Sequence, residues 1–129
     1  MKHPKRFLHI GSGRKRMANT PFAGQAWQEV RLDIDPTVEP DVVGTMLDLS
    51  PIPANSIDAI YSSHNLEHIY PHEVSLALAE FRRVLRDDGF LLITCPDLRS
   101  VCALVADDKL TDPAYLSGMG PIAPIDILY

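Results

Sequence analysis

The chain has 129 residues, an apolar fraction of 46% and a formal net charge of −5 at pH 7. This length suits a single globular domain over residues 1–129. No stretch approaches the roughly 18 consecutive apolar residues of a membrane-spanning helix, and the first residues lack the apolar run of a secretory signal. The two cysteines, Cys95 and Cys102, form no disulfide framework, so we expect a cytoplasmic protein without a membrane partner.

The charge is unevenly distributed along the chain. Residues 1–28 contain six Lys or Arg and no acidic residue, whereas the remainder carries the other six basic residues against all 17 acidic ones, a net charge of −11. The acidic balance argues against a nucleic-acid partner. The basic cluster Arg14–Arg16 either faces an anionic ligand or is a solvated loop.

The first predicted element is a buried strand, Phe7–Ile10, that runs into the glycine loop Gly11–Gly13. Glycines allow unusual backbone dihedral angles and let a ligand approach backbone N–H groups, as in sites for nucleotide-like cofactors. A Gly-x-Gly pair alone also occurs in turns that bind nothing. The second predicted strand, Glu29–Asp35, supplies carboxylates about 20 residues after the glycines, which is the spacing of an acid that holds a ribose.

The connection between these strands is predicted to be short or irregular. Pro21 and Gly24 interrupt any helix there, so we expect at most one or two helical turns, around Gly24–Glu29. A third strand is predicted at Asp41–Thr45, followed by a proline-rich loop, and a fourth at Ile57–Tyr61.

The pattern then changes to a helical period. It predicts a helix over Pro71–Asp88 with Gly89 at its C-terminal cap. The residues of its apolar face are Val74, Ala77, Leu78, Phe81, Val84 and Leu85. Phe90–Cys95 is typical of a fully buried strand, and a second helix is predicted at Leu98–Ala106.

Strands that alternate with helices indicate a parallel sheet. Right-handed crossovers predict five strands in the order 3-2-1-4-5, with the fifth strand, Phe90–Cys95, at an edge. An exposed edge strand and the apolar tail Ile122–Tyr129 are both unfavourable in water. We therefore expect a homodimer formed through the fifth-strand edge.

With these elements placed, residues 7–97 resemble the class I S-adenosylmethionine-dependent methyltransferases, in particular the small type 11-like group. The segments that carry the resemblance are Leu8–Gly13, Leu32–Pro36, Met46–Asp48, Asn55–His68 and Phe81–Ile93. It implies an α/β fold, a Rossmann-like three-layer sandwich that lacks the family's usual last two strands. It also implies methyl transfer from S-adenosylmethionine to an acceptor, a small molecule or another group, that the sequence does not identify.

The resemblance also implies a set of cofactor-binding residues. These are Gly11, Ser12, Gly13, Asp33, Ile34, Leu47, Asp48, Ser62 and Ser63. The glycines would let the backbone pass close to the methionine part of the cofactor, and the serines would face that part. Asp33 would accept both ribose hydroxyls, while Leu47 and Asp48 would border the adenine. Catalysis would come from proximity and in-line orientation without a metal, and His64 is a candidate catalytic residue with a positioning role.

Three features depart from the family pattern. His9 stands where the family usually has an acid, Lys15 stands where a further glycine is common, and the chain ends before the last two strands.

Three alternatives remain at this stage. A dinucleotide-binding oxidoreductase that uses NAD would share the sheet and the ribose acid, but Arg16 stands where its third glycine should be. A zinc hydrolase would use the inverted His-x-x-Glu-His pattern of His64–His68, although Pro71 follows too soon for a long zinc-binding helix. The third alternative is a non-catalytic fragment that binds the cofactor and needs a partner to complete its sheet.

Overall fold

The computed structural model describes residues 3–117 and 120–128. These residues form two compact units that divide after Cys95. The second unit contains α2 (Leu98–Ala106), the antiparallel pair β6 (Tyr115–Ser117) and β7 (Gly120–Ile122), and α3 (Pro124–Leu128). The prediction of α2 is confirmed, whereas the short elements in the tail were not predicted. Tyr129, the last residue of the apolar tail, lies outside the described residues.

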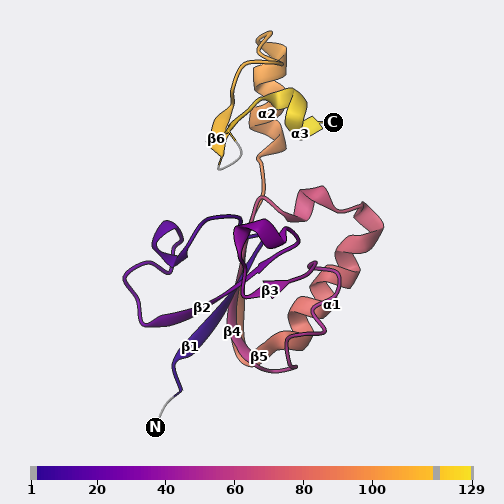
Figure 1. Cartoon of the computed structure of the whole chain (residues 1–129). Coiled ribbons are helices and arrows are strands. Elements are labelled where there is room, and N and C mark those ends of the chain that lie inside the picture. The colour runs from indigo at the N-terminus through magenta and orange to yellow at the C-terminus, as the bar shows by residue number, and fades with distance from the viewer. Residues whose placement is uncertain (1–2, 118–119, 129) are drawn as a thin grey trace. The chain divides into compact units, whose positions relative to one another are not determined.

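The first unit is built on a parallel sheet of five strands in the order β3-β2-β1-β4-β5 (Figure 1). The strands are β1 (Lys5–Ile10), β2 (Trp27–Asp33), β3 (Val42–Val43), β4 (Ile57–Ser63) and β5 (Leu85–Thr94). All four neighbouring pairs are parallel, so the predicted strand order and direction are confirmed. β5 lies at the edge of this sheet, beside β4, as predicted.

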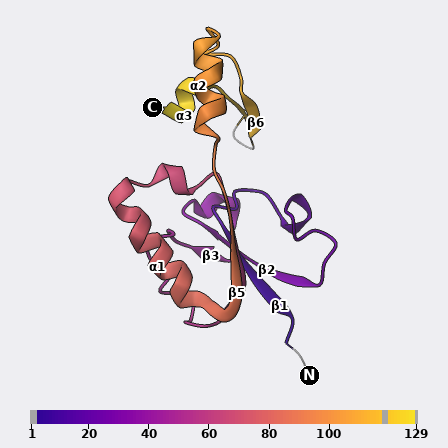
Figure 2. The same ribbon diagram turned by 180° about the vertical axis from the view of Figure 1, so that it is seen from behind.

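One face of the sheet is covered by α1 (Val74–Val84), which follows a 3-10 turn at Pro71–Glu73 (Figures 1 and 2). Ala77, Phe81 and Val84 are buried on this helix, at the apolar spacing that the sequence predicted, whereas Leu78 of the predicted apolar face is 40% exposed. They pack with Leu8 and other alternate residues of the central strands, which form the main hydrophobic core.

The helix ends at Val84, so its predicted extension to Asp88 is wrong. The backbone N–H groups of Asn55 and Ser56 donate to the carbonyl oxygens of Arg83 and Val84, and β5 begins at the next residue. Gly89 is therefore not a helix cap but a residue of β5. A Cβ atom on Gly89 would lie 2.9 Å from the Asp58 carbonyl oxygen, which explains glycine at this close approach of two backbones.

The prediction that the fifth strand is fully buried is also wrong. Phe90 and Leu91 are 48% and 37% exposed. An edge strand lacks a neighbour on one side, and apolar side chains alone do not indicate whether a strand lies at the centre or at the edge.

The other face of the sheet is covered by the β1–β2 connection. Its helical turn is the 3-10 helix Met17–Asn19, not a turn at Gly24–Glu29, because β2 already begins at Trp27. The ring of Phe22 stacks on that of Phe7 at 4.2 Å between centroids and meets Trp27 edge to face. The aromatic side chain of Phe22 therefore anchors this loop on the sheet as the third layer of the sandwich.

The remaining strand boundaries differ by a few residues from those predicted. β2 ends at Asp33, because Asp35 caps the 3-10 helix Pro36–Val38 by accepting from the N–H of Thr37. β3 is shorter than predicted, and β4 continues to Ser63.

In the part of the chain that the structure describes, no helix is long and apolar enough to cross a membrane.

Candidate functional site

The carboxyl ends of β1, β2 and β4 meet at one edge of the sheet. In the strand register Ile10 lies between Leu32 of β2 and Ser62 of β4. β1 is the point from which the chain crosses to one side for β2 and β3 and to the other for β4 and β5. Ligands of open α/β sheets bind at this kind of topological switch point.

The glycine loop follows β1 at this position. Gly11 and Gly13 have φ angles of +56° and +53°, in the left-handed region that favours glycine. A Cβ atom on Gly11 would collide with the side-chain oxygen of Asn65, whereas nothing lies within 4 Å of the corresponding position on Gly13. Ser12 between them is buried, and its N–H donates to the Leu32 carbonyl at 3.2 Å. Gly11 is thus required for packing, and Gly13 borders open space.

Asp33, at the end of β2, is tied to the glycine loop. Its Oδ2 accepts from the N–H of Gly13 at 2.7 Å, and its Oδ1 accepts from the N–H of Asp35 at 2.9 Å. A carboxylate oxygen can accept more than one hydrogen bond, so both Asp33 oxygens retain capacity for further donors. The structure therefore brings together the loop and the acid that the sequence paired by spacing.

The end of β4 lies on the other side of the glycine loop. Ser62 is fully buried, and the Ser63 hydroxyl oxygen accepts from Thr94 Oγ1 at 2.8 Å and lies 3.1 Å from His64 Nδ1. His64 has a φ angle of +57°. The serines predicted from the sequence therefore end the strand next to β1, and His64 lies beside Ser63.

Asn65 is a site residue that the sequence analysis did not identify. Its Nδ2 donates to the Ile10 carbonyl at 2.9 Å and to the Ser63 carbonyl at 3.1 Å. It thereby links the ends of β1 and β4 and lies against Gly11. A single asparagine in a polar turn carries no sequence signal for this role, because its partner Ile10 on β1 lies 55 residues away in the chain.

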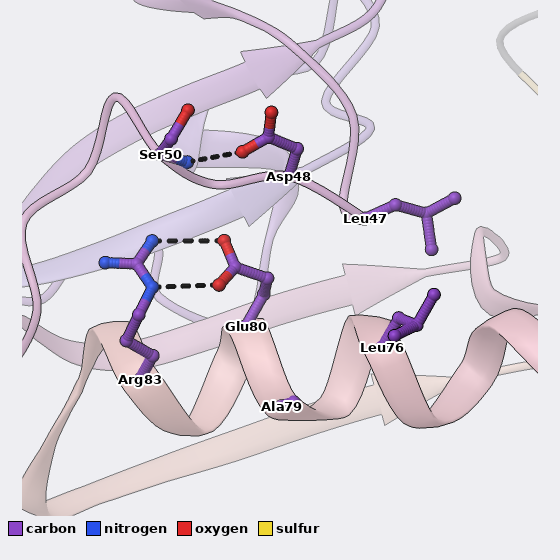
Figure 3. A pocket seen from close by; sticks show the side chains of 7 residues that line it. All are labelled: Leu47, Asp48, Ser50, Leu76, Ala79, Glu80 and Arg83. Atoms are coloured by element: carbon purple, nitrogen blue, oxygen red, sulfur yellow. Dashed lines mark hydrogen bonds and ion pairs between the residues drawn. The ribbon is translucent and has the colours of Figure 1, made fainter.

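The remaining predicted residues are Ile34, Leu47 and Asp48. Ile34 follows β2 and is 74% exposed. Asp48 is exposed and accepts from the N–H of Ser50 at 3.0 Å. Leu47 and Asp48 line an open pocket of about 460 Å³ whose other wall is α1, with Leu76 among the α1 residues (Figure 3). The residues that line this pocket do not include the glycine loop.

This pocket contains a Glu–Arg pair, Glu80 and Arg83, that the sequence analysis did not identify. Glu80 Oε1 accepts from Arg83 Nε at 2.8 Å (Figure 3), and Glu80 Oε2 also accepts from the Leu49 N–H at 2.6 Å. Arg83 also donates to the carbonyls of Leu49 and Ile52. The hydrogen bond from Arg83 lowers the pKa of Glu80. The pair therefore fastens the loop that follows Asp48 to α1.

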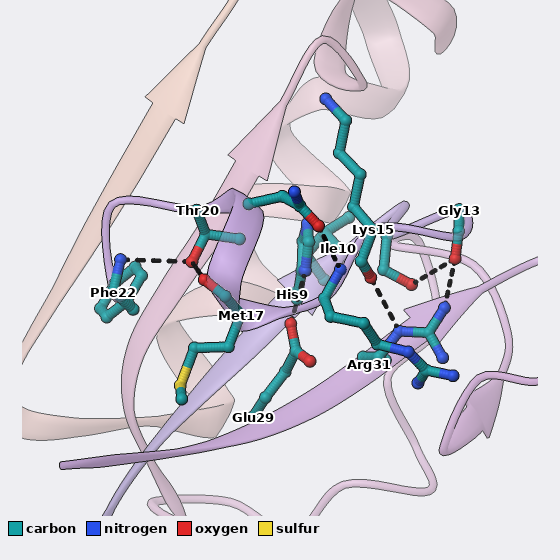
Figure 4. A network of polar contacts seen from close by, with 12 residues as sticks. His9, Ile10, Gly13, Lys15, Met17, Thr20, Phe22, Glu29 and Arg31 are labelled. Carbon is teal, nitrogen blue, oxygen red and sulfur yellow. Dashed lines mark hydrogen bonds and ion pairs between the residues drawn. The ribbon is translucent and has the colours of Figure 1, made fainter. Parts of the chain in front are cut away.

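His9, at the position where the family usually has an acid, is buried beneath the β1–β2 connection. Its Nδ1 lies 2.9 Å from Glu29 Oε2 (Figure 4). Burial lowers the pKa of His9, although the neighbouring Glu29 carboxylate acts in the opposite direction. A neutral imidazole that donates its Nδ1–H to Glu29 fits this environment.

The geometry also bears on the zinc alternative. His64 precedes the 3-10 helix Leu66–His68 with a left-handed backbone, so His64 and His68 do not lie one turn apart on a continuous helix. Within residues 3–117 and 120–128, no group of three or more His, Cys, Asp or Glu side chains is placed to hold a metal ion.

The class of protein follows from the family comparison. The family model described as a methyltransferase domain matches residues 8–93, which include the glycine loop, Asp33 and the end of β4. The chain belongs to this methyltransferase-domain family.

Solved structures share the fold. An S-adenosylmethionine-dependent methyltransferase from Archaeoglobus fulgidus is 22% identical with a TM-score of 0.64, and the match covers 79% of this chain and 49% of that one. A protein from Pyrococcus horikoshii is 23% identical with a TM-score of 0.63, over 83% and 56% of the two chains. The 1,6-didemethyltoxoflavin-N1-methyltransferase of Burkholderia thailandensis, solved with 1,6-didemethyltoxoflavin and S-adenosylhomocysteine, is 16% identical with a TM-score of 0.57, over 93% and 68%.

At these identities the similarity shows the fold alone. The chain spans about half the length of the first two structures. No curated protein matches the sequence significantly.

Proposed function

We propose that the chain binds S-adenosylmethionine at the carboxyl ends of β1, β2 and β4. We propose further that it serves the transfer of the cofactor's methyl group to an acceptor. The observation that carries the proposal is the hydrogen bond between Gly13 and Asp33, in a domain of the methyltransferase family. It places a glycine loop with open space beside it next to a carboxylate with spare acceptor capacity.

The residues at this edge fit the parts of the cofactor. Asp33 accepts hydrogen bonds from the ribose diol, since a carboxylate receives two neighbouring hydroxyl groups well. The open side of Gly13 allows close approach to the backbone. Cofactor-binding residues proposed for the methionine part are Gly11, Ser12, Gly13, Ser62 and Ser63, and those proposed for the adenosine part are Asp33, Ile34, Leu47 and Asp48.

The adenine of the cofactor is proposed to lie beyond Asp33, near Ile34, Leu47 and Asp48. Ile34 offers an exposed apolar surface just beyond Asp33, and Asp48 offers a carboxylate acceptor for an exocyclic amine. Leu47 and Asp48 are proposed to border the adenine from the loop that Glu80 and Arg83 fasten to α1.

The chemistry requires little from the protein besides positioning. When bound, the cofactor supplies a methyl group on a sulfonium, which is already activated for displacement. The chain's own residues would bind and orient the cofactor. The rate gain would come from the proximity of its methyl group to the acceptor and from their alignment. His64, held next to Ser63, is the candidate for positioning the acceptor. The acceptor itself is not assigned, because substrate contacts depend on the site and not on the fold.

Titration with S-adenosylhomocysteine tests the binding step. We expect saturable one-to-one binding, and weaker or no binding of NAD. Tight binding of NAD without S-adenosylhomocysteine would favour the oxidoreductase. Transfer of a labelled methyl group to an acceptor pool then separates an enzyme from a domain that only binds the cofactor.

A further inference from the structure

Arg31 is the largest fully buried side chain of the first unit, at 2% exposure. It lies on β2, two residues before Asp33, and alternation along the strand puts both side chains on the face covered by the β1–β2 connection. A buried guanidinium is costly unless its donors are satisfied. The acceptors of the Arg31 guanidinium therefore indicate its structural role.

The guanidinium bridges two loops, and Figure 4 shows its contacts with Gly13 and Lys15 on the glycine-loop side. On the glycine-loop side, Nε donates to the Lys15 carbonyl at 3.1 Å and Nη2 donates to the Gly13 carbonyl. On the other side, Nη1 donates to the Glu39 carbonyl at 2.9 Å and Nη2 to the Val38 carbonyl at 3.2 Å. One loop leaves β1 and the other leaves β2, so the four acceptors lie on both sides of the segment that ends in Asp33.

The first loop needs such a support because no α-helix follows the glycines. In a helix the carbonyls of the first turn would accept from backbone N–H groups four residues later. In this chain the connection forms only the 3-10 turn Met17–Asn19, and the Gly13 and Lys15 carbonyls accept from Arg31 instead. The planar fork of an arginine supplies several donors in fixed directions, which a lysine does not.

The carbonyl and the N–H of Gly13 are used by two side chains of the same strand. Arg31 binds the carbonyl, and Asp33 accepts from the N–H. Fixing the Gly13 carbonyl fixes the orientation of the loop, and with it the N–H that holds the Asp33 carboxylate.

We infer that Arg31 is a positioning residue that presets the Gly13–Asp33 pair for the cofactor. It touches the two loops and acts through them. This inference rests on the proposed function for the ligand, but the order that Arg31 imposes on the loops exists without ligand.

The test compares Arg31→Lys, Arg31→Met and Arg31→Ala with the control Arg86→Met in the full chain. Arg86 lies on β5, where it pairs with Asp58 at 3.4 Å, away from both loops. Amide hydrogen exchange of residues 11–16 and 37–39 is measured without ligand, and circular dichroism checks that each variant is folded. Affinity for S-adenosylhomocysteine is then measured by titration.

We expect faster exchange in both loops of Arg31→Lys and roughly 10-fold to 100-fold weaker binding, as for the loss of one or two hydrogen bonds to a charged group. Added methylguanidinium should slow the exchange and restore part of the affinity of Arg31→Ala, which general loss of stability would not allow. The control should match the wild type.

Unchanged exchange in the two loops of Arg31→Lys, or weaker binding without faster exchange, would overturn the inference. If Arg31→Met does not fold, Arg31→Lys and the rescue of Arg31→Ala decide. Failure of the wild type to bind S-adenosylhomocysteine would instead refute the proposed function, and the exchange experiment would still test Arg31.

Discussion

The backbone N–H of Gly13 donates to Oδ2 of Asp33 at 2.7 Å, across the 20 residues that separate them in the chain. The glycine loop and the acid therefore form one unit before any ligand binds. A preset carboxylate lowers the ordering cost of binding, because its orientation is already fixed.

Asp33→Ala should strongly weaken binding of S-adenosylhomocysteine. Charge-assisted hydrogen bonds from the ribose would be lost, together with the bond from Gly13, and a loss of about 2–4 kcal/mol corresponds to roughly 30-fold to 1,000-fold weaker affinity. Isothermal titration of both proteins with S-adenosylhomocysteine measures this difference in affinity. Equal affinities of Asp33→Ala and the wild type would refute the proposal that Asp33 binds the ribose.

Asp35→Ala is the matched control for this experiment. Asp35 is exposed and caps the 3-10 helix Pro36–Val38, where hydrogen bonds from Thr37 lower its pKa. Its loss should cost less affinity than that of Asp33, because it removes a turn and not a proposed ligand contact.

The two glycines of the loop should respond differently to alanine. Both substitutions place alanine in the left-handed region, at a cost of about 1–2 kcal/mol in unfolding free energy. Gly11→Ala should cost more than Gly13→Ala, because Asn65 has to move. Denaturant unfolding of both variants measures the difference.

Asn65→Ala in the Gly11→Ala background tests this cause. The double variant should be less destabilised than the sum of the single variants, with a coupling of about 0.5–3 kcal/mol. Strict additivity would show that Asn65 and Gly11 do not constrain each other.

The Glu80–Arg83 pair predicts a pH dependence of stability. The hydrogen bond from Arg83 lowers the pKa of Glu80 in the fold below its ordinary value of 4.5. A group whose pKa is lowered by folding stabilises the fold above its ordinary pKa, and this contribution is lost as the pH falls through the lower, folded value. The difference in unfolding free energy between the wild type and Glu80→Gln should therefore be constant near neutral pH and shrink below about pH 4.5. A difference that grows on acidification would contradict the pair's role.

The edge strand β5 should mediate self-association. Phe90 and Leu91 are partly exposed on a strand whose other edge pairs with β4, and unpaired edges favour pairing with another chain. We expect sedimentation at micromolar concentration to show a dimer, and Leu91→Lys to shift it to monomer. Leu78→Lys, on the exposed side of α1, is the control that should leave the dimer intact. A monodisperse monomer of the wild type would contradict this prediction.

The sequence by itself determined the parallel sheet, its strand order and the pairing of the glycine loop with Asp33. These rest on short-range signals: apolar strands, the change from period two to a helical period, and a glycine–acid spacing set by one crossover between parallel strands. The same signals gave the apolar face of α1, whose buried residues recur every three or four positions.

The tertiary structure alone decided where α1 ends and which polar side chains hold the site. Val84 is the last residue of α1 because its carbonyl accepts from Ser56, a residue from a distant loop. Arg31 and Asn65 look like ordinary polar residues in the sequence, since no local pattern shows that their acceptors will be carbonyls of neighbouring strands and loops. Such partners are brought within reach only when the chain folds, and the cost of burying an unsatisfied donor then selects these side chains.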